Sequence, residues 1–180
     1  MEYSTRLRSW TRAEYDRLIA VGVFRPGEPL ELLGGHMLVA EPQGSAHHTA
    51  LGLVEDALRI AFGAGWLVRS QGPIALDDES EPEPDVAVAP GSRRDYSRAH
   101  PARPVLVVEV AESSLALDRE YKGSLYARAQ LQDYWILNLL NLGHRTAGGA
   151  GRSGACRRSP PLGVISRPAD RRRPAGSAGS

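Results

Sequence analysis

Apolar and polar positions alternate along residues 1–140 in a way that predicts three helices and several short strands. Helices are expected where apolar residues recur every three or four positions, at residues 11–21, 46–61 and 115–129. Strands are expected where short apolar runs lie between Gly, Pro or polar residues, at 30–33, 36–39, 66–69, 74–76, 85–89, 105–110 and 134–137. This mixture predicts an α/β domain with a central mixed β-sheet flanked by helices.

Local signals mark several of these boundaries. Thr11 and Glu14 have the spacing of a capping box at the start of the first helix. Gly34 and Gly35 separate two apolar runs and indicate a tight hairpin. Ser45 is a candidate N-cap for the second helix. Residues 105–110 are apolar except for Glu109, which is typical of a central strand covered on both faces.

Two polar segments are expected to be loops. Residues 77–83 carry five acidic side chains and are expected to be solvated. Residues 90–104 contain Arg93, Arg94, Arg98 and Arg103. These arginines either contact backbone phosphates of a nucleic acid or simply face solvent.

Charge divides the chain into two parts. Residues 1–140 carry a formal net charge of −6, and residues 141–180 carry +7, because eight arginines there face one acid. We therefore expect a domain over residues 1–140 and a disordered tail rich in Arg, Gly, Ala, Pro and Ser over 141–180. Two interpretations of the tail are open: a basic nucleic-acid-binding segment or the product of a frameshift in a GC-rich gene, which we favour.

Composition also bounds the cellular setting. No run of 18 apolar residues is present, so no membrane span is expected. The N-terminus lacks the pattern of a signal peptide. The single cysteine, Cys156, excludes a disulfide framework and favours the cytoplasm.

Three residues form a candidate catalytic set. Asp85 opens one predicted strand, Glu109 lies within another, and Lys122, the only lysine, lies on the following helix. Alternation along a strand places Glu109 on the same face as Val107 and Ala111. If the strands at 85 and 109 are neighbours, both carboxylates and the lysine converge. Oxygen donors suit a hard divalent cation, which assists phosphodiester hydrolysis.

Each member also has a structural interpretation. Asp85 would be an ordinary residue at the start of a strand. Glu109 would form a buried ion pair with an arginine such as Arg69 or Arg119. Lys122 would be an exposed helix residue paired with Asp118, four residues earlier.

The order of these motifs resembles the PD-(D/E)XK restriction-endonuclease-like superfamily and, more closely, its Uma-type family. The matching stretches are Ser113, His47 and residues 11–15 (TRAEY), 31–35 (ELLGG), 84–88 (PDVAV), 107–110 (VVEV), 118–127 and 134–137 (YWIL). In the simple superfamily motif a lysine stands where Ala111 lies here, and the resemblance implies its relocation to Lys122. Gln130 and Leu131 replace a usual Gly-Val pair, and no strand-rich pattern follows residue 140.

The resemblance implies a restriction-endonuclease-like fold and a site that holds Mg²⁺ or Mn²⁺. Its ligands would be Asp85, Glu109 and the backbone carbonyl of Val110, with Glu31 as an auxiliary ligand. Lys122 would position the attacking water, and His47 would contact a phosphate or a metal-bound water. The resemblance also implies a homodimer.

These observations favour a metal-dependent endonuclease that acts on nucleic acid, DNA in preference to RNA. A nuclease fold that binds without cutting, or a truncated frame-shifted remnant, are the alternatives. No Gly-rich phosphate loop followed by lysine is present in the sequence, so NTP hydrolysis of that type is unsupported.

Overall fold

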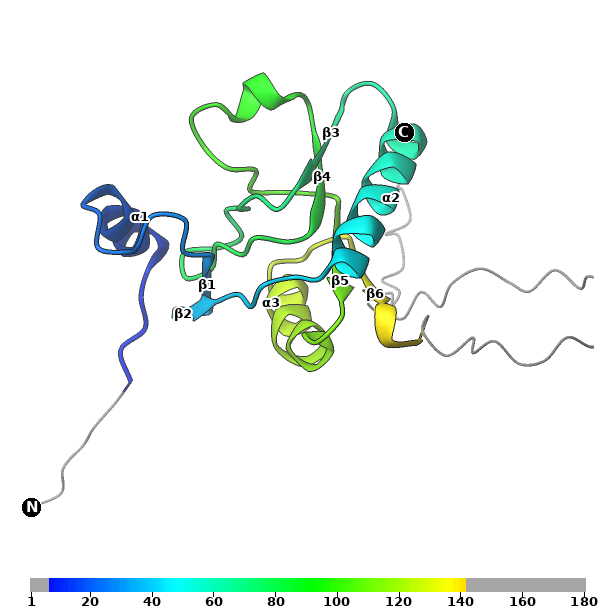
Figure 1. The fold of residues 1–180 in the computed structure, drawn as a ribbon. Helices are drawn as coiled ribbons and strands as arrows, with labels where there is room; N and C mark the ends of the chain where they lie inside the picture. Colours follow the sequence, from blue (N-terminus) through cyan, green and yellow to red (C-terminus); the bar gives the residue numbers. More distant parts are fainter. Residues whose placement is uncertain (1–6, 142–180) are drawn as a thin grey trace, which may run out of the picture.

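A four-stranded mixed sheet lies at the centre of the computed structural model, which describes residues 7–141 (Figure 1). Its strand order is β3-β4-β5-β6, and a separate hairpin pairs β1 with β2. The strands are β1 (Leu30–Leu33), β2 (His36–Val39), β3 (Trp66–Ser70), β4 (Val86–Pro90), β5 (Leu106–Ala111) and β6 (Asp133–Asn138). The α-helices are α1 (Arg12–Ala20), α2 (Ser45–Phe62) and α3 (Gly123–Arg128). The predicted α/β class with a central mixed sheet is confirmed.

Strand β5 is the centre of this sheet. It runs antiparallel to β4 and parallel to β6, and all six of its residues are buried. One face packs against α2, where Leu51 and Leu58 contact valines of β3, β4 and β5. On the other face Val107 and Ala111 pack with Tyr126 of α3. Burial on both faces explains the nearly continuous apolar run in the sequence.

The pairing of β4 with β5 brings the predicted acidic residues together. Val86 lies opposite Val108 in an antiparallel register. Asp85, one residue before Val86, therefore lies beside Glu109, one residue after Val108. From the sequence, the contact between these residues was expected only if the two strands were neighbours. The observed pairing of β4 with β5 meets that condition.

Two predicted boundary signals form as expected. The Thr11 side chain accepts from the backbone N–H of Glu14, and the Glu14 side chain accepts from the Thr11 backbone, completing the capping box. Gly34 and Gly35 have φ values of 55° and 79°. A Cβ atom on Gly35 would also lie 2.6 Å from Cβ of Ser9, so glycine is required there for both conformation and space.

Two expectations about helices are wrong. Helix α2 begins at Ser45 itself, so its N-cap is Gly44, and no side-chain cap forms there. The segment expected as one α-helix over 115–129 contains a π-helix, Leu117–Lys122, before α3. The backbone N–H of Gly123 donates to the carbonyl of Asp118, five residues earlier.

The segment between β3 and β4 also differs from expectation. Residues 74–76 form no strand, because their backbone bonds go to Pro82, Pro101 and Ser80 instead of a neighbouring strand. The acidic segment 77–83 is only partly solvated: Ser80 and Glu81 are buried, and the Glu81 backbone donates to Leu32 of β1. This segment thereby fastens the hairpin to the sheet.

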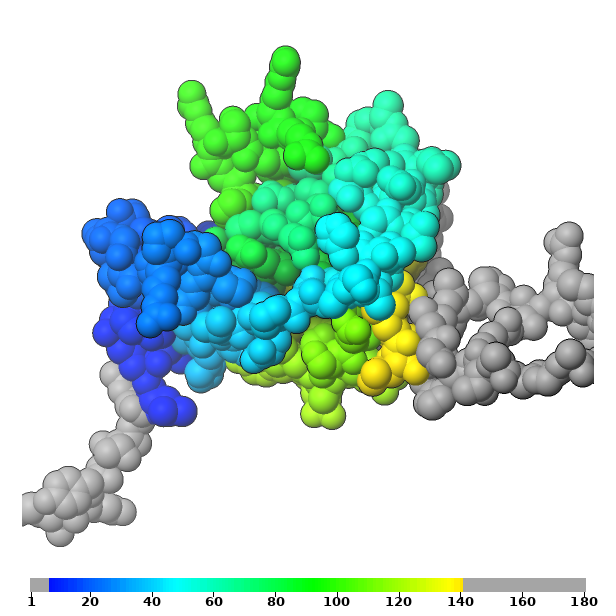
Figure 2. Space-filling model, viewed as in Figure 1, coloured from blue at the N-terminus to red at the C-terminus, as the bar shows by residue number. Residues whose placement is uncertain are grey.

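Other parts project from this body. The region of α1 and the loop after β4, which contains a 3₁₀ helix at Arg93–Tyr96, extend from the sheet (Figure 2). Within residues 7–141, no helix is long and apolar enough to cross a membrane. The expected tail over 141–180 and its two interpretations fall almost wholly outside the described residues.

Glu81 predicts a pH dependence of stability. Its side chain is 5% exposed. Burial, together with repulsion from Asp16 and Glu83, raises its pKa to about 7, although Arg12 opposes the rise; His100 lies 3.8 Å away. A carboxyl with a raised folded-state pKa stabilises the fold fully below its unfolded pKa, and this contribution is lost as pH rises through about 7.

The free energy of unfolding should therefore fall by roughly 1–3 kcal/mol more between pH 5 and pH 8 in the wild type than in Glu81→Gln. Urea titrations at both pH values measure this difference. Glu79→Gln, at an exposed position of the same segment, is the control and should follow the wild type. Parallel pH profiles for wild type and Glu81→Gln would contradict the assignment.

Candidate functional site

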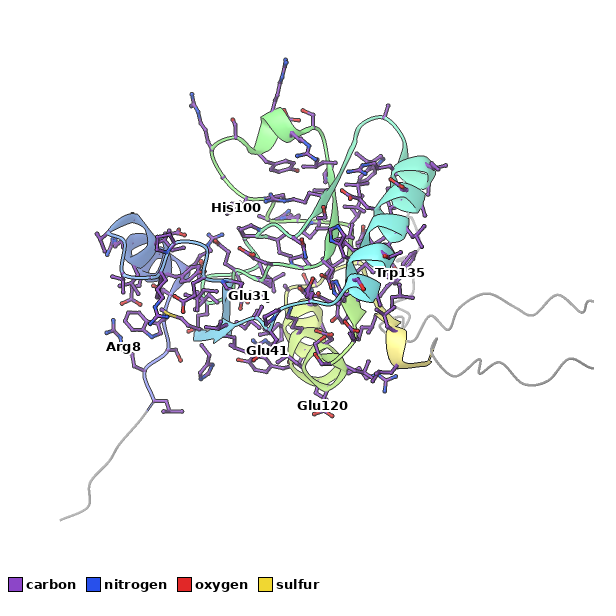
Figure 3. All side chains as sticks on the ribbon, viewed as in Figure 1. Arg8, Glu31, Glu41, His100, Glu120 and Trp135 are labelled. Carbon is purple, nitrogen blue, oxygen red and sulfur yellow. The ribbon has the colours of Figure 1, made fainter. Side chains whose placement is uncertain are left out.

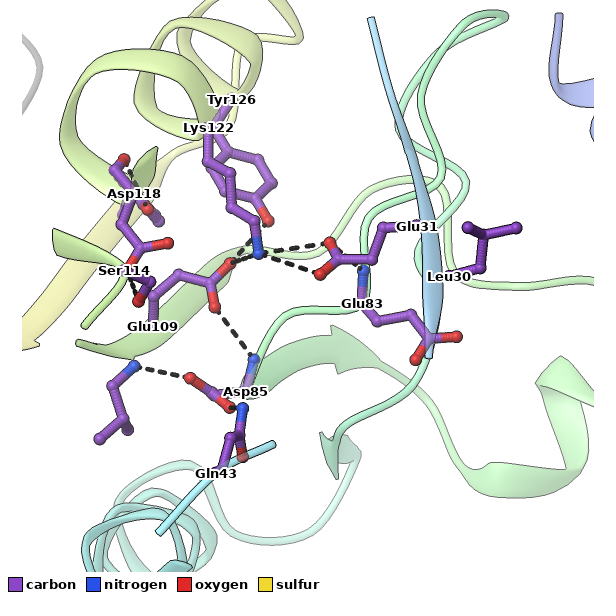
Figure 4. A network of polar contacts seen from close by, with 12 residues as sticks. Leu30, Glu31, Gln43, Glu83, Asp85, Glu109, Ser114, Asp118, Lys122 and Tyr126 are labelled. Atoms are coloured by element: carbon purple, nitrogen blue, oxygen red, sulfur yellow. Dashed lines mark hydrogen bonds and ion pairs between the residues drawn. The ribbon is translucent and has the colours of Figure 1, made fainter. Parts of the chain in front are cut away.

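A cavity of about 340 Å³ lies where the hairpin, the start of α2, the ends of β4 and β5, and the π-helix meet. Seven carboxylates and one lysine contribute to its wall, namely Glu31, Glu41, Glu83, Asp85, Glu109, Glu112, Asp118 and Lys122. Figure 4 shows the side chains of Glu31, Glu109 and Lys122 directed toward one another from separate elements. The cavity therefore gathers nearly all of the candidate residues found in the sequence.

Asp85 is held by hydrogen bonds on one side of its carboxylate. Its Oδ2 accepts from the backbone N–H of Val110 at 2.8 Å and from Nε2 of His47 at 3.1 Å. Its Oδ1 has only a long contact, 3.4 Å, from Nε2 of Gln43. Asp85 is thus a fixed carboxylate with one oxygen still available toward the cavity.

Glu109 and Lys122 form a buried ion pair. Lys122 Nζ lies 3.2 Å from Oε1 of Glu109, and Tyr126 donates its hydroxyl to the same oxygen at 3.1 Å. Oε2 accepts from the backbone N–H of Asp85 at 3.3 Å. Glu109 and Lys122 are 3% and 5% exposed. The arginine partner considered for Glu109 is not the observed one, and Lys122 is not the exposed residue of the structural interpretation.

Glu31 completes the surroundings of the lysine. Strand β1 places its Oε2 3.2 Å from Lys122 Nζ (Figure 4). The same oxygen accepts from the backbone N–H of Glu83 at 3.1 Å. Lys122 therefore bridges two carboxylates from different sheets, and Glu31 lies inside the molecule between the hairpin and the helices (Figure 3).

The π-helix sets the position of Lys122. Tyr134 of β6 donates its hydroxyl to the Asp118 carbonyl at 2.9 Å, and Ser114 donates to the Asp118 carboxylate at 2.6 Å. Asp118 is buried but forms no direct ion pair with Lys122. Short π-helical segments occur frequently at functional sites. Here the segment carries the lysine that faces Glu31 and Glu109.

Burial controls the electrostatics of the site. It raises the pKa of Glu109 to about 8, an effect that Lys122 opposes and Asp85 reinforces. Burial also raises the pKa of Asp118. For Lys122, burial opposes the charge, but Glu109, Glu31 and Asp118 outweigh it and raise the pKa of the ammonium group. The lysine is therefore a stable cation among carboxylates that exceed it in number.

Sequence reasoning missed several supporting residues. His47 was expected to contact a phosphate or water, but its Nε2 bonds Asp85 within a buried setting. Its Nδ1 is buried with no hydrogen-bond partner among the described residues. Tyr126 lies in the predicted helix over 115–129 and Glu83 in the segment expected to be solvated, and neither was assigned a part in the site. Tyr126 lies four residues after the only lysine on the predicted helix, and this spacing was a signal that it could contact the site. No comparable signal marked Gln43.

The donor set fits a hard divalent cation held by few protein ligands. Oδ1 of Asp85 and Oε2 of Glu109 keep only long contacts, while the other oxygen of each carboxylate is committed. Within residues 7–141, no three His, Cys, Asp or Glu side chains form a complete metal-binding group. Mg²⁺ is usually bound by one or two carboxylates, with waters and substrate oxygens completing its shell. The Val110 carbonyl remains a predicted ligand at the cavity wall.

Comparison with known proteins identifies the family of this chain. The model of the Uma2 family, described as "Putative restriction endonuclease", matches residues 12–153. The chain belongs to the Uma2 family. No curated protein matches it.

A solved structure adds a weaker likeness to this Uma2 protein. It is described as a putative nuclease belonging to DUF820 from Anabaena variabilis ATCC 29413. The two share 12% sequence identity and a TM-score of 0.49, over 61% of this chain and 65% of that one. The chain thus matches less than two thirds of the length of that protein.

The buried pair of Lys122 and Glu109 in this Uma2 protein predicts that two substitutions change the free energy of unfolding in opposite directions. Lys122→Met should destabilise the protein by about 3–5 kcal/mol, because it leaves buried carboxylates without their cation. Adding Glu109→Gln should recover part of this loss, since one of the unpaired charges disappears. Urea unfolding measures both.

Arg119→Met is the matched control on the same helix. Arg119 is exposed, so its loss should change the free energy of unfolding by less than about 0.5 kcal/mol. A double variant as unstable as the sum of its single variants would show that Lys122 and Glu109 are energetically independent.

Proposed function

We propose that this protein is a Mg²⁺- or Mn²⁺-dependent endonuclease that hydrolyses phosphodiester bonds in nucleic acid, DNA in preference to RNA. The observation that carries the proposal is the pair of fixed carboxylates, Asp85 and Glu109, beside the buried Lys122 in one cavity. The family description points to the same class of activity. The homodimer implied by resemblance belongs to the proposal as well.

Each residue of the candidate site would have its own role in hydrolysis. Asp85 Oδ1 and Glu109 Oε2 would hold the cation, which supplies Lewis-acid chemistry and an activated water when bound. Lys122 would offset the negative charge that develops on the phosphate in the transition state. Water adds to phosphorus, one P–O ester bond breaks, and the leaving oxygen takes up a proton. The products are one phosphate monoester end and one hydroxyl end.

Charge explains why the cation would be needed for substrate binding as well. Residues 1–140 carry a formal net charge of −6, and seven carboxylates line the cavity. A phosphate entering this cavity is repelled unless positive charge is added. Lys122 alone is already shared between Glu31 and Glu109.

Cleavage should depend on Glu109 and Lys122. We expect Glu109→Gln and Lys122→Met to lower the rate of Mn²⁺-dependent cleavage at least about 100-fold, because each removes an interaction with the cation or the transition state. Single-stranded DNA, duplex DNA and RNA are the substrates to compare.

Glu120→Gln is the control for this assay, because Glu120 lies at the outer side of the same helical region (Figure 3). It should cleave like the wild type. Equal cleavage by all variants would place the activity elsewhere, and no cleavage by a folded wild type would favour the binding-only alternative.

Metal binding can be measured without activity. Calorimetric titration with Mn²⁺ should show one site in the wild type, no site in Asp85→Ala, and about 10- to 100-fold weaker binding in His47→Leu, because His47 orients the ligand carboxylate. Asp56→Asn, an exposed acid on α2, should bind like the wild type. Unchanged binding by Asp85→Ala would remove Asp85 from the proposed ligands.

A further inference from the structure

A second cavity, of about 320 Å³, lies beside edge strand β3, under the loop that follows β4. Two arginines, Arg69 and Arg93, contribute to its lining with Leu67, Gln71, Gly72 and Tyr96. No Asp or Glu lines it. This is the reverse of the acidic cavity and of the net negative charge of residues 1–140.

The two guanidinium groups lack internal partners among the described residues. Neither Arg69 nor Arg93 forms an ion pair with a described carboxylate. Burial and the nearby charge of Arg93 lower the pKa of Arg69, while Glu83 opposes this. Two cations facing one half-buried space repel each other, and a bound anion would relieve that repulsion.

The absence of a side chain at Gly72 leaves room for the Arg69 guanidinium. A Cβ atom at Gly72 would lie 2.6 Å from Nε and 2.8 Å from Cζ of Arg69, and would overlap Nη2 as well. The planar group therefore lies directly against the backbone of Gly72. The planar guanidinium presents its donors in a rigid fork, which is the geometry that matches phosphate oxygens.

Gln71 connects this cavity to the candidate active site. It has a φ of 46°, which is uncommon for a residue other than glycine. Its backbone N–H donates to the Asp85 carbonyl at 3.1 Å, and its side chain donates to Gln43 at 2.9 Å. A third cavity, of about 640 Å³, shares Gln71 with the arginine-lined cavity, and Gln43 and Asp85 with the acidic cavity.

The sheet register gives the distance between Arg69 in the second cavity and Glu109 in the candidate active site. Arg69 lies opposite Ala87, and Ala87 lies opposite Val107, two residues before Glu109. With roughly 4.8 Å between strands and 3.4 Å per residue, the Cα atoms of Arg69 and Glu109 are about 12 Å apart. Along the axis of a B-form duplex, where each strand has one phosphate per about 3.4 Å, this corresponds to about three to four nucleotides.

We propose that Arg69 and Arg93 form a phosphate-binding subsite that holds the backbone of the nucleic acid a few nucleotides from the bond to be cut. That the ligand is a polynucleotide rests on the proposed function. That the cavity binds phosphate is argued from the two arginines alone. Arg94, Arg98 and Arg103, which the sequence grouped with Arg93, do not line the cavity.

The test measures binding of a fluorescein-labelled single-stranded 12-nucleotide DNA by anisotropy, in EDTA and at several NaCl concentrations. Arg69→Gln and Arg93→Gln should each weaken binding about 5- to 10-fold. Each should also reduce the slope of log K against log salt by about 0.7, the value for one lost phosphate contact in a single strand. Arg98→Gln, an exposed arginine of the same loop, should bind like the wild type.

A parallel titration with inorganic phosphate identifies the source of the ligand. Arginine-dependent binding of the oligonucleotide, with phosphate much weaker, supports the backbone subsite. Arginine-dependent binding of inorganic phosphate alone would overturn the polynucleotide assignment. Arg93 is exposed, so Arg93→Gln keeps the test valid even if Arg69→Gln fails to fold.

Cleavage assays separate this proposal from the proposed function. If the wild type cleaves and the Arg69 and Arg93 variants bind and cleave identically, the subsite is wrong and the nuclease assignment stands. If oligonucleotide binding requires both arginines but nothing is cleaved, the subsite stands and the nuclease assignment fails. No binding of either probe by the wild type overturns the subsite.

Discussion

The burial of Lys122 against Glu109 is the constraint on which the rest of the structure depends. Removing these two ions from water costs several kcal/mol each, which good geometry and additional hydrogen bonds must offset. Tyr126, the backbone of Asp85 and the carboxylate of Glu31 supply those contacts. Each comes from a different element, so the ion pair is satisfied only when hairpin, sheet and helix are assembled together.

Local signals in the sequence were sufficient for most elements. The capping box at Thr11, the glycine pair at 34–35 and the apolar run around Glu109 each act over a few residues, and each formed as predicted. Asp85, Glu109 and Lys122 could be singled out because charges inside or beside apolar runs need a partner. Their contact required the β4–β5 register, which spacing alone does not reveal.

The sequence-based predictions that were wrong concern segments whose structure is set by contacts with distant parts of the chain. Acidic composition predicted solvent around residues 77–83, but Glu81 pairs with Leu32 in the hairpin. The apolar residues 74–76 resembled a strand, although their backbone bonds close on Pro82 and Pro101. In the π-helix, the Asp118 carbonyl accepts a hydrogen bond from the Tyr134 hydroxyl of β6. A periodic pattern along one helix contains no information about such a donor.

Negative and positive side chains line two different cavities, and this separation bears on how both proposed sites would act together. The cavity at Asp85 and Glu109 has an excess of negative charge, whereas the cavity at Arg69 and Arg93 is lined by positive charge alone. Phosphates would bind readily at the arginines and be repelled at the carboxylates unless a cation is present. A strand anchored at the arginines would therefore reach the acidic cavity productively only when metal occupies it. Binding and metal-dependent cutting would then be separable properties of the same surface.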